Sequence, residues 1–244
     1  MIRLWWSRQI NDRYSGPQSF HVIFKKMGRG IKLIGVSFLM SLSTLTWAGL
    51  SNGTEIGKFR NTWYCVALET EYTSTPQNQT IYDMDGNSMA IVHEGFKKEL
   101  KIEGSGELLD GRMVNYAGVK DGEHRYRFTP NPYGDGVGNC ALVPFHTIAV
   151  DPEMIPLGAL VRIPETEGMI LPDGSSHNGL WRAEDIGSAI KRDRIDIFAG
   201  AGHSGGKVLE RHGIKNLQPL TVELVEEGPA NGCVTQPPPA PPNI

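Results

Sequence analysis

The chain has 244 residues, of which 39% are hydrophobic and 21% charged, and its formal net charge is −3. This composition is typical of a globular protein with one substantial core, and it excludes collagen, coiled coils and wholly disordered chains. Residues 1–48 hold seven Lys or Arg and one acid, so the remainder carries 17 basic and 26 acidic residues, a net charge of −9. Such a surface repels polyphosphate and, without a basic patch, predicts no nucleic-acid partner.

The N-terminal region has the sequence pattern of an export signal. An uncharged run of eighteen residues, Leu33 to Leu50, follows Lys25, Lys26, Arg29 and Lys32 and closes on small residues around Ala48. This order of basic, apolar and small residues is typical of a secretory signal peptide. We therefore expect residues 1–48 to be a signal peptide, with Met27 as a second candidate start. The mature protein is then periplasmic or secreted and not stably inserted in a membrane; a single transmembrane anchor is the alternative.

The mature chain is predicted to be rich in short strands. Glycine and proline interrupt it every eight to fifteen residues, and the β-rich runs between them are residues 62–68, 113–117, 147–150, 160–163, 194–198 and 220–225. Helical periodicity is scarce, with one candidate over 93–100 and a single turn over 187–191. Many short strands with irregular connections predict a small β barrel. The proline-rich end, residues 229–244, predicts an extended tail.

Cysteine and histidine spacing predicts no metal site. Cys65, Cys140 and Cys233 are separated by 75 and 93 residues, which matches no compact zinc pattern, and the histidines of the mature chain form no pair spaced by four residues. We expect one disulfide and one free thiol, with the pairing open, and neither a metal nor another cofactor.

Three aspartates end or interrupt apolar runs between residues 146 and 198. Asp151 precedes a proline, which predicts a sharp turn that its own carboxylate can cap. Asp185 precedes Gly187-Ser188, where capping of a helical turn would explain a carboxylate. Asp196 is different because strand alternation places it opposite Ile195 and Ile197. If those isoleucines face the core, Asp196 faces a groove, where partial desolvation favours a protonated carboxyl that can donate its proton.

The sequence at these residues resembles the three-aspartate (3D) domain, found in the membrane-bound lytic transglycosylase A family and in smaller secreted cell-wall proteins. The resemblance rests on four ordered segments, namely Ile148-Ala149-Val150-Asp151-Pro152, Ile155-Pro156-Leu157-Gly158, Asp185-Ile186-Gly187-Ser188-Ala189-Ile190-Lys191 and Arg194-Ile195-Asp196-Ile197-Phe198. The earlier run Phe59 to Tyr64 is similar to the first barrel strand of this group. The resemblance covers roughly residues 59–225.

The resemblance implies a mainly β fold, a six-stranded double-psi β barrel over residues 49–228 with short helices and a small insertion at about 73–140. It also implies a groove that binds a peptidoglycan glycan strand. The family's catalytic acid corresponds to Asp196, with Asp185 supporting it across the groove, and Thr62 and Tyr64 match groove residues of the first strand. We further expect Asp151 and Lys191 to contact the substrate, although Lys191 is equally well explained as a solvated residue at the end of a turn.

Counting carboxylates predicts the reaction. Ordinary glycoside hydrolysis needs two carboxylates, whereas a lytic transglycosylase uses the C6 hydroxyl of N-acetylmuramic acid as nucleophile and needs one acid, here Asp196. Two alternatives stay open. One is a hydrolase that uses Asp185 and Asp196 together, and the other is a non-catalytic glycan-binding barrel in which Trp63, Tyr64 and Trp181 offer stacking faces. An aspartic protease is disfavoured because the chain holds one Asp-Ile-Gly-Ser loop, and such a dyad needs two.

Overall fold

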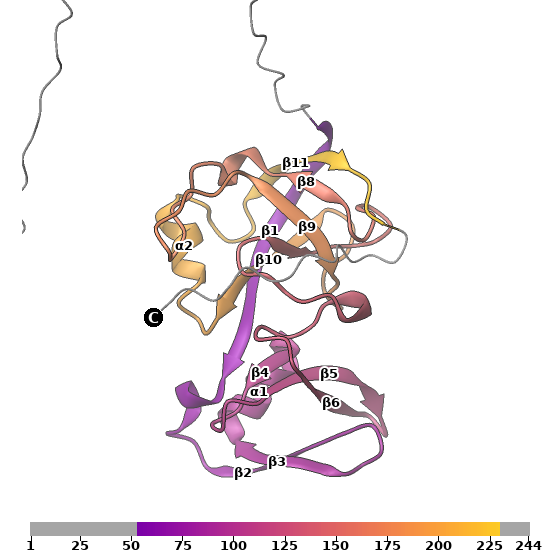
Figure 1. Ribbon diagram of the computed structural model, residues 1–244, viewed down its shortest axis with the longest axis vertical. Coiled ribbons are helices and arrows are strands. Elements are labelled where there is room, and N and C mark those ends of the chain that lie inside the picture. The colour runs from indigo at the N-terminus through magenta and orange to yellow at the C-terminus, as the bar shows by residue number, and fades with distance from the viewer. Residues whose placement is uncertain (1–52, 230–244) are drawn as a thin grey trace, which may run out of the picture. The chain divides into compact units, whose positions relative to one another are not determined.

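The computed structural model describes residues 53–229 (Figure 1). The predicted signal peptide, Cys233 and residues 230–244 of the predicted tail lie outside these residues. Within them the fold is mainly β with short helices, and the predicted six-stranded double-psi β barrel is confirmed. The six barrel strands are β1 (Thr54–Leu68), β7 (Thr147–Ala149), β8 (Leu160–Arg162), β9 (Leu180–Asp185), β10 (Arg194–Ala201) and β11 (Pro219–Glu226).

The barrel closes through hydrogen bonds between its first and fifth strands. The strands pair in the order β1, β10, β7, β9, β8 and β11, and β11 pairs with β1 again. Two pairs are parallel, β1 with β10 and β7 with β9, and the other pairs are antiparallel. A closed ring leaves no unpaired edge, which is why strands as short as three residues can hold their place.

Alternation along the strands fills the barrel interior. Ile195 and Ile197 of β10 are fully buried, as are Ile148 of β7 and Val161 of β8. Trp181 of β9 lies in the same core, and its indole N–H donates to the Thr166 hydroxyl at 2.9 Å, so its one polar atom is satisfied. The 3₁₀ turn η3 (Pro164–Thr166) and the helix α2 (Gly206–Arg211) connect strands outside the ring.

The segment between β1 and β7 forms a second, smaller core. Its elements are η1 (Glu69–Tyr72), β2 (Gln77–Tyr82), β3 (Ser88–His93), α1 (Glu94–Glu103), β4 (Ser105–Glu107), β5 (Met113–Lys120), β6 (Glu123–Thr129) and η2 (Val137–Asn139). We call this segment, residues 69–139, the insertion. Phe96 and Leu100, four residues apart on α1, are fully buried against Val114 and Tyr126 of the β5–β6 hairpin.

Strand β1 joins the two cores, since its first part belongs to the barrel and its last residues pair with β4 (Figure 1). Its register against β10 shifts between Tyr64 and Val66, which is a bulge. The Cys65 N–H at this bulge instead donates to the Glu103 carboxylate at 2.7 Å. A side chain of the insertion thus satisfies a backbone group of the barrel strand.

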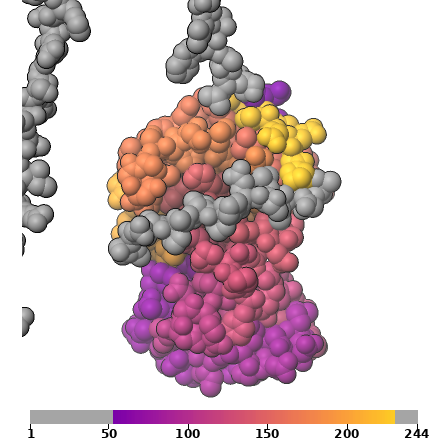
Figure 2. Space-filling view, viewed as in Figure 1, coloured from indigo at the N-terminus to yellow at the C-terminus, as the bar shows by residue number. Residues whose placement is uncertain are grey.

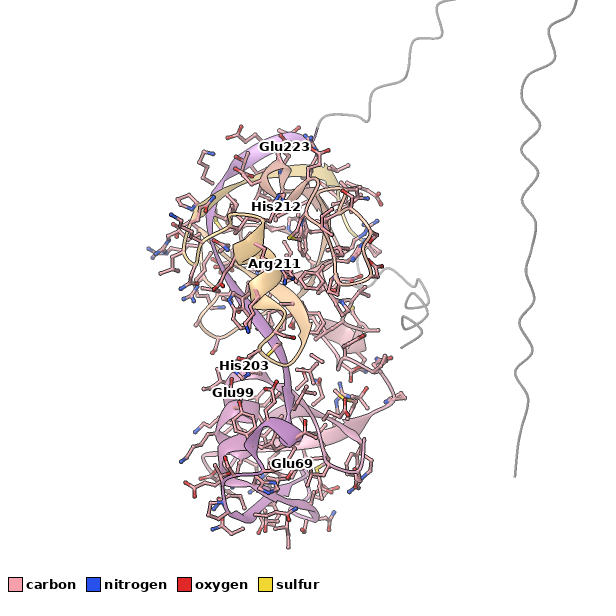
Figure 3. The ribbon with its side chains drawn as sticks, turned by 90° about the vertical axis from the view of Figure 1, so that its left-hand side faces the viewer. Glu69, Glu99, His203, Arg211, His212 and Glu223 are labelled. Atoms are coloured by element: carbon pink, nitrogen blue, oxygen red, sulfur yellow. The ribbon has the colours of Figure 1, made fainter. Side chains whose placement is uncertain are left out.

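His203 links the barrel to the insertion at a second place. It lies on the loop after β10, and Figure 3 shows it beside Glu99 of α1. Its Nδ1 lies 2.9 Å from a carboxylate oxygen of Glu71, and its Nε2 lies 3.1 Å from one of Glu99. Both nitrogens of one imidazole ring therefore face carboxylates of the insertion.

The cysteines of the described residues differ in state. Cys140 is disulfide-bonded, whereas Cys65 is free and fully buried. Burial raises the pKa of the Cys65 thiol, with nearby carboxylates adding to the effect. A thiol that stays protonated is a poor nucleophile, so Cys65 serves as a core residue.

Candidate active site

Strand pairing brings the second and third aspartates of the motif to either side of one small residue. Ala149, at the end of β7, pairs with Asp196 of β10 on one side and with Asp185 of β9 on the other. Strand β10 pairs with β7 along one edge and with β1 along the other, where Thr62 lies opposite Asp196. Because Ile195 and Ile197 point into the barrel core, the Asp196 side chain points outward, as the sequence alternation predicts.

The Asp196 carboxyl is held by one hydroxyl. Thr62 Oγ1 donates to Asp196 Oδ1 at 2.6 Å, and the Arg194 guanidinium donates to the same hydroxyl at 3.4 Å. Burial raises the pKa of Asp196 to about 6, and the Thr62 hydrogen bond and the positive charge of Arg194 only partly oppose that rise. A large share of this carboxyl therefore carries a proton near pH 6, where a solvated aspartate would be ionised.

Asp185 has a different pair of donors. The Tyr64 hydroxyl donates to its Oδ2 at 2.7 Å, and the Ile186 backbone N–H donates to its Oδ1 at 2.8 Å. Burial raises the pKa of Asp185 to about 6, the two hydrogen bonds oppose the rise, and the charge of Asp196 adds to it. The pKa of Tyr64 is raised well above its usual value by burial and then by Asp185, so it stays a donor. The residues directly after Asp185 form a turn and no helix begins there, so the helix-cap explanation does not apply.

Tyr64, Asp185 and Asp196 line a groove of about 630 Å³, and Thr62 is not among its lining residues. Its barrel wall carries Tyr64, Ala149, Asp185, Asp196 and Lys191, and its other wall comes from the insertion. In Figure 2 the pink atoms of the chain after β6 lie between the orange barrel and the magenta insertion. The groove rim includes the largely exposed apolar side chains Ile102, Tyr116 and Ile186, against which the faces of a sugar ring can pack.

Two further carboxyls line this groove and are absent from the sequence motif, namely Asp135, which is paired with Arg127, and Glu103. Glu103, the last residue of α1, lines the groove, and its Oε2 accepts the Cys65 N–H. Burial raises the pKa of Glu103 to about 7, and the charges of Glu99 and Asp196 contribute to that rise. Its only sequence signal is a glutamate directly before Gly104, which ends the helix with a positive φ of 82°. Sequence reasoning therefore missed it.

Asp151 lies at a turn beside the barrel wall. Its Oδ2 accepts the Arg192 backbone N–H at 2.7 Å and its Oδ1 accepts the Glu153 N–H at 3.2 Å, which ties the loop after β7 to the loop before β10. These backbone bonds lower the pKa of Asp151, so its carboxylate is ionised. The geometry matches the turn-capping explanation, and a substrate contact by Asp151 stays a prediction.

The aromatic residues named for sugar stacking do not form open faces. Trp181 is fully buried and stacks on His177 with ring centroids 4.5 Å apart. Tyr64 is 8% exposed and held by Asp185, and Trp63 packs against the barrel core and the backbone of Gly206. The expectation that Trp181 offers a stacking face is therefore wrong, because alternation along β9 turns its ring inward.

Within residues 53–229, no group of three or more His, Cys, Asp or Glu side chains is arranged to hold a metal ion. Among the helices described here, none has the length and apolar character needed to cross a bilayer.

Comparison with protein families identifies the segment that carries this geometry. Residues 146–215 match the family model of the 3D domain. Residues 146–215 therefore form a 3D domain within the chain. The match contains β7 to α2, and with them Asp151, Asp185 and Asp196 of the 3D domain, which confirms the resemblance seen in the sequence. The comparison with curated proteins gave no match.

Solved structures similar to this 3D-domain protein include MltA of Escherichia coli with bound chitohexaose, at 18% identity and a TM-score of 0.47, covering 71% of this chain and 73% of that one. The lytic transglycosylase LtgG of Burkholderia pseudomallei has 20% identity and a TM-score of 0.40, covering 69% and 70%. MltA from Neisseria gonorrhoeae has 21% identity and a TM-score of 0.41, covering 60% and 47%.

Proposed function

We propose that this 3D-domain protein is an exported lytic transglycosylase that cleaves the glycan strand of peptidoglycan. The observation that carries the proposal is the Asp196 carboxyl, which lines an open groove, is fixed by the Thr62 hydroxyl and has its pKa raised to about 6 by burial. A general acid works best when its pKa lies near the working pH, and this carboxyl meets that requirement.

The proposed reaction uses Asp196 twice. Asp196 first gives its proton to the glycosidic oxygen as the bond to C1 of N-acetylmuramic acid breaks. The C6 hydroxyl oxygen of the same sugar then bonds to C1, and the Asp196 carboxylate takes the hydroxyl proton, which restores the acid and leaves a 1,6-anhydro ring. Thr62 orients the carboxyl, and its hydrogen bond stabilises the ionised form between the two proton transfers.

Asp185 has a supporting role in this proposal. It lies on the far side of Ala149 from Asp196, and Tyr64 and the Ile186 N–H fix both of its oxygens. The charge of Asp196 raises the pKa of Asp185, so the two carboxyls do not ionise independently. Lys191 is exposed on the groove wall, and in this proposal it contacts a polar group of the strand.

The test is mass spectrometry of the soluble products after purified peptidoglycan is incubated with the protein. We expect anhydro-muropeptides, and we expect the Asp196→Asn variant to release them 10²- to 10⁴-fold more slowly, which is the usual contribution of a general acid. The matched control is Asp193→Asn, since Asp193 is an exposed aspartate just before β10 that pairs with Arg60 at 3.1 Å. Full activity in Asp196→Asn would contradict the assignment.

A two-carboxylate hydrolase is the second candidate, because Asp185 is another buried carboxyl in the same groove with a pKa raised to about 6. In that reaction water attacks C1, and the products carry reducing ends that are one water heavier than anhydro ends. Reducing-end products that disappear in both Asp185→Asn and Asp196→Asn would favour the hydrolase. Binding to the cell wall without release by any variant would favour a glycan-binding barrel.

Export of the protein is part of the proposal and rests on the sequence of residues 1–48, which lie outside the described residues. The basic residues, the uncharged run and the small residues near Ala48 support it. N-terminal sequencing of the protein from the cell envelope should give a start close to Gly49. A full-length chain recovered from the membrane fraction would instead favour the transmembrane anchor.

A further inference from the structure

The insertion contains a second cavity that the proposed reaction does not use. It has a volume of about 370 Å³ and lies between β2, α1 and β6. Its lining residues are Thr80, Ile81, Tyr82, Gly86, Lys97, Glu123, His124, Arg125 and Tyr126. His124 also lines the main groove, so the cavity adjoins the place where the glycan strand is proposed to bind. We call it the Arg125 pocket.

The guanidinium of Arg125 is enclosed but poorly paired. Its side chain is only 13% exposed, and its Nε is buried without a hydrogen-bond partner among the described residues. The ion pair that it forms in this part of the chain is with Asp121, at 4.0 Å, and the Asp121 side chain is 81% exposed. The Tyr82 ring lies under the guanidinium at 5.5 Å. A buried guanidinium normally has close carboxylate or phosphate partners, since burying its charge is costly.

The other charged groups around the pocket favour an anion. Lys97 reaches it from α1, and His124 flanks Arg125 on β6. Glu123 is the one carboxylate among the lining residues, and it is exposed at the start of β6. Arg125 presents a planar fork of N–H donors, which matches the two oxygens of a carboxylate, and Lys97 adds a second positive charge.

We propose that the Arg125 pocket binds a carboxylate on the peptide branch of the glycan strand held in the main groove. This inference rests on the proposed function, because that function puts a peptidoglycan strand in the groove. Peptidoglycan carries peptides on the lactyl group of N-acetylmuramic acid, and those peptides end in or contain free carboxylates. The shared position of His124 makes the pocket the neighbouring site for such a branch. Arg125 is then a determinant of preference for peptide-bearing strands.

The first experiment measures cleavage of two substrates, glycan strands with their peptides and strands stripped of peptides by an amidase. We expect Arg125→Gln to raise KM for peptide-bearing strands about 10- to 100-fold, with kcat unchanged, and to leave KM for stripped strands as it was. Arg125→Lys keeps the positive charge but not the planar fork of donors, so its KM for peptide-bearing strands should lie between those of the parent and Arg125→Gln. The matched control is Arg112→Gln, because Arg112 also lies over an aromatic ring, Phe128 at 4.6 Å, but is paired with Asp110 at 2.7 Å.

A second experiment does not depend on catalysis. The full chain labelled with ¹⁵N is titrated with muramyl dipeptide, and the arginine Nε–Hε signals are followed by NMR, with inorganic phosphate as a parallel titration. We expect a saturable shift of the Arg125 signal with muramyl dipeptide and none of the Arg112 signal. The inference would be overturned if the Arg125 signal did not move, or if it moved with phosphate alone. It would also be overturned if the ratio of KM for peptide-bearing strands to KM for stripped strands were the same in Arg125→Gln and the parent. If the protein bound muramyl dipeptide at Arg125 but cleaved no glycan strand, the proposed reaction would be wrong and the binding site at Arg125 would still be supported.

Discussion

Asp196 and Thr62 form a pair whose hydrogen bond sets the pH range of the proposed reaction. The acid must start protonated, and the pKa of Asp196 is about 6, so the rate should fall as the pH rises through 6. The Thr62 hydroxyl stabilises the ionised form of Asp196, because it donates to the carboxylate at 2.6 Å. Its removal in Thr62→Val should therefore raise the pKa of Asp196 and move this falling limb upward by about one pH unit.

The measurement is the pH dependence of kcat/KM for anhydro-product release by the parent and Thr62→Val. Thr54→Val is the control, since Thr54 lies at the exposed start of the same strand. A limb that stays in place, or moves to lower pH, would show that Thr62 does not act through the proton of Asp196.

Glu103 is a buried acid that stabilises the fold only while it is protonated. Its pKa is raised from 4.5 to about 7, chiefly by burial. Its contribution to the free energy of unfolding is thus fully present below pH 4.5 and is lost as the pH rises through 7. Glu103→Gln keeps an acceptor for the Cys65 N–H without this loss. We expect it to exceed the parent in stability by up to about 3 kcal/mol at pH 8, with little difference at pH 4.

Urea denaturation at the two pH values provides the check on Glu103. Glu94→Gln, at the other end of α1, is the control, because Glu94 forms an exposed pair with Lys98 that contributes well under about 1 kcal/mol. Destabilisation of Glu103→Gln at pH 8 would mean that the ionised carboxylate, rather than the neutral acid, is the form the fold needs.

At the scale of elements, the connection from β6 back to the barrel depends on a close approach of two backbones. A Cβ at Gly136 would lie 2.2 Å from the Glu184 carbonyl oxygen on β9, directly before Asp185. Gly136→Ala must therefore push the connection or β9 aside, at a cost of about 1–3 kcal/mol, and should also slow product release. Gly111→Ala is the comparison, because that turn glycine has open space and a φ of 81°, which costs about 1 kcal/mol without touching the groove.

Thermal denaturation and product release, measured on both variants, separate these effects. Gly136→Ala should lower both quantities, whereas Gly111→Ala should lower only stability. If Gly136→Ala kept the activity of the parent, the spacing between Gly136 and β9 would not control the position of Asp185.

The elements that sequence reasoning predicted are those whose side chains alternate strongly. The isoleucines around Asp196 predict β10 and the outward direction of its carboxyl, and the predicted helix over 93–100 lies almost wholly in α1. Strand β9 was not predicted as a strand, because Arg182, Glu184 and Asp185 give it a polar composition although half of its residues are buried in the barrel. Strand β4 and helix α2 are too short for periodicity to show. The sequence around Glu103 does not predict it as a groove residue, because its position in the groove results from the packing of the insertion.

At the scale of the whole described unit, two histidines give stability opposite dependences on pH. Burial lowers the pKa of His177 to about 4, and its Nδ1 accepts the Gly179 N–H while its Nε2 donates to the Phe145 carbonyl, so only the neutral ring fits. Its contribution to stability is present above pH 6.5 and is lost as the pH falls through 4. The pKa of His203 is raised, first by its hydrogen bond to Glu71, so its contribution is present below pH 6.5 and is lost as the pH rises through that raised value.

The bridge made by His203 between Glu71 and Glu99 therefore holds the barrel loop to the insertion most strongly in acid (Figure 3). Only the protonated ring has two N–H donors, so deprotonation removes one of the two bonds. His203→Gln should lower the free energy of unfolding by about 0.5–1 kcal/mol at pH 5.5, because these half-exposed pairs are screened, and by less at pH 9. Urea denaturation across this range tests it, with His212→Gln, directly after α2, as the control. A deficit in His203→Gln that grows as the pH rises would mean that neutral His203 makes the stronger link, and the acid-strengthened bridge would be discarded.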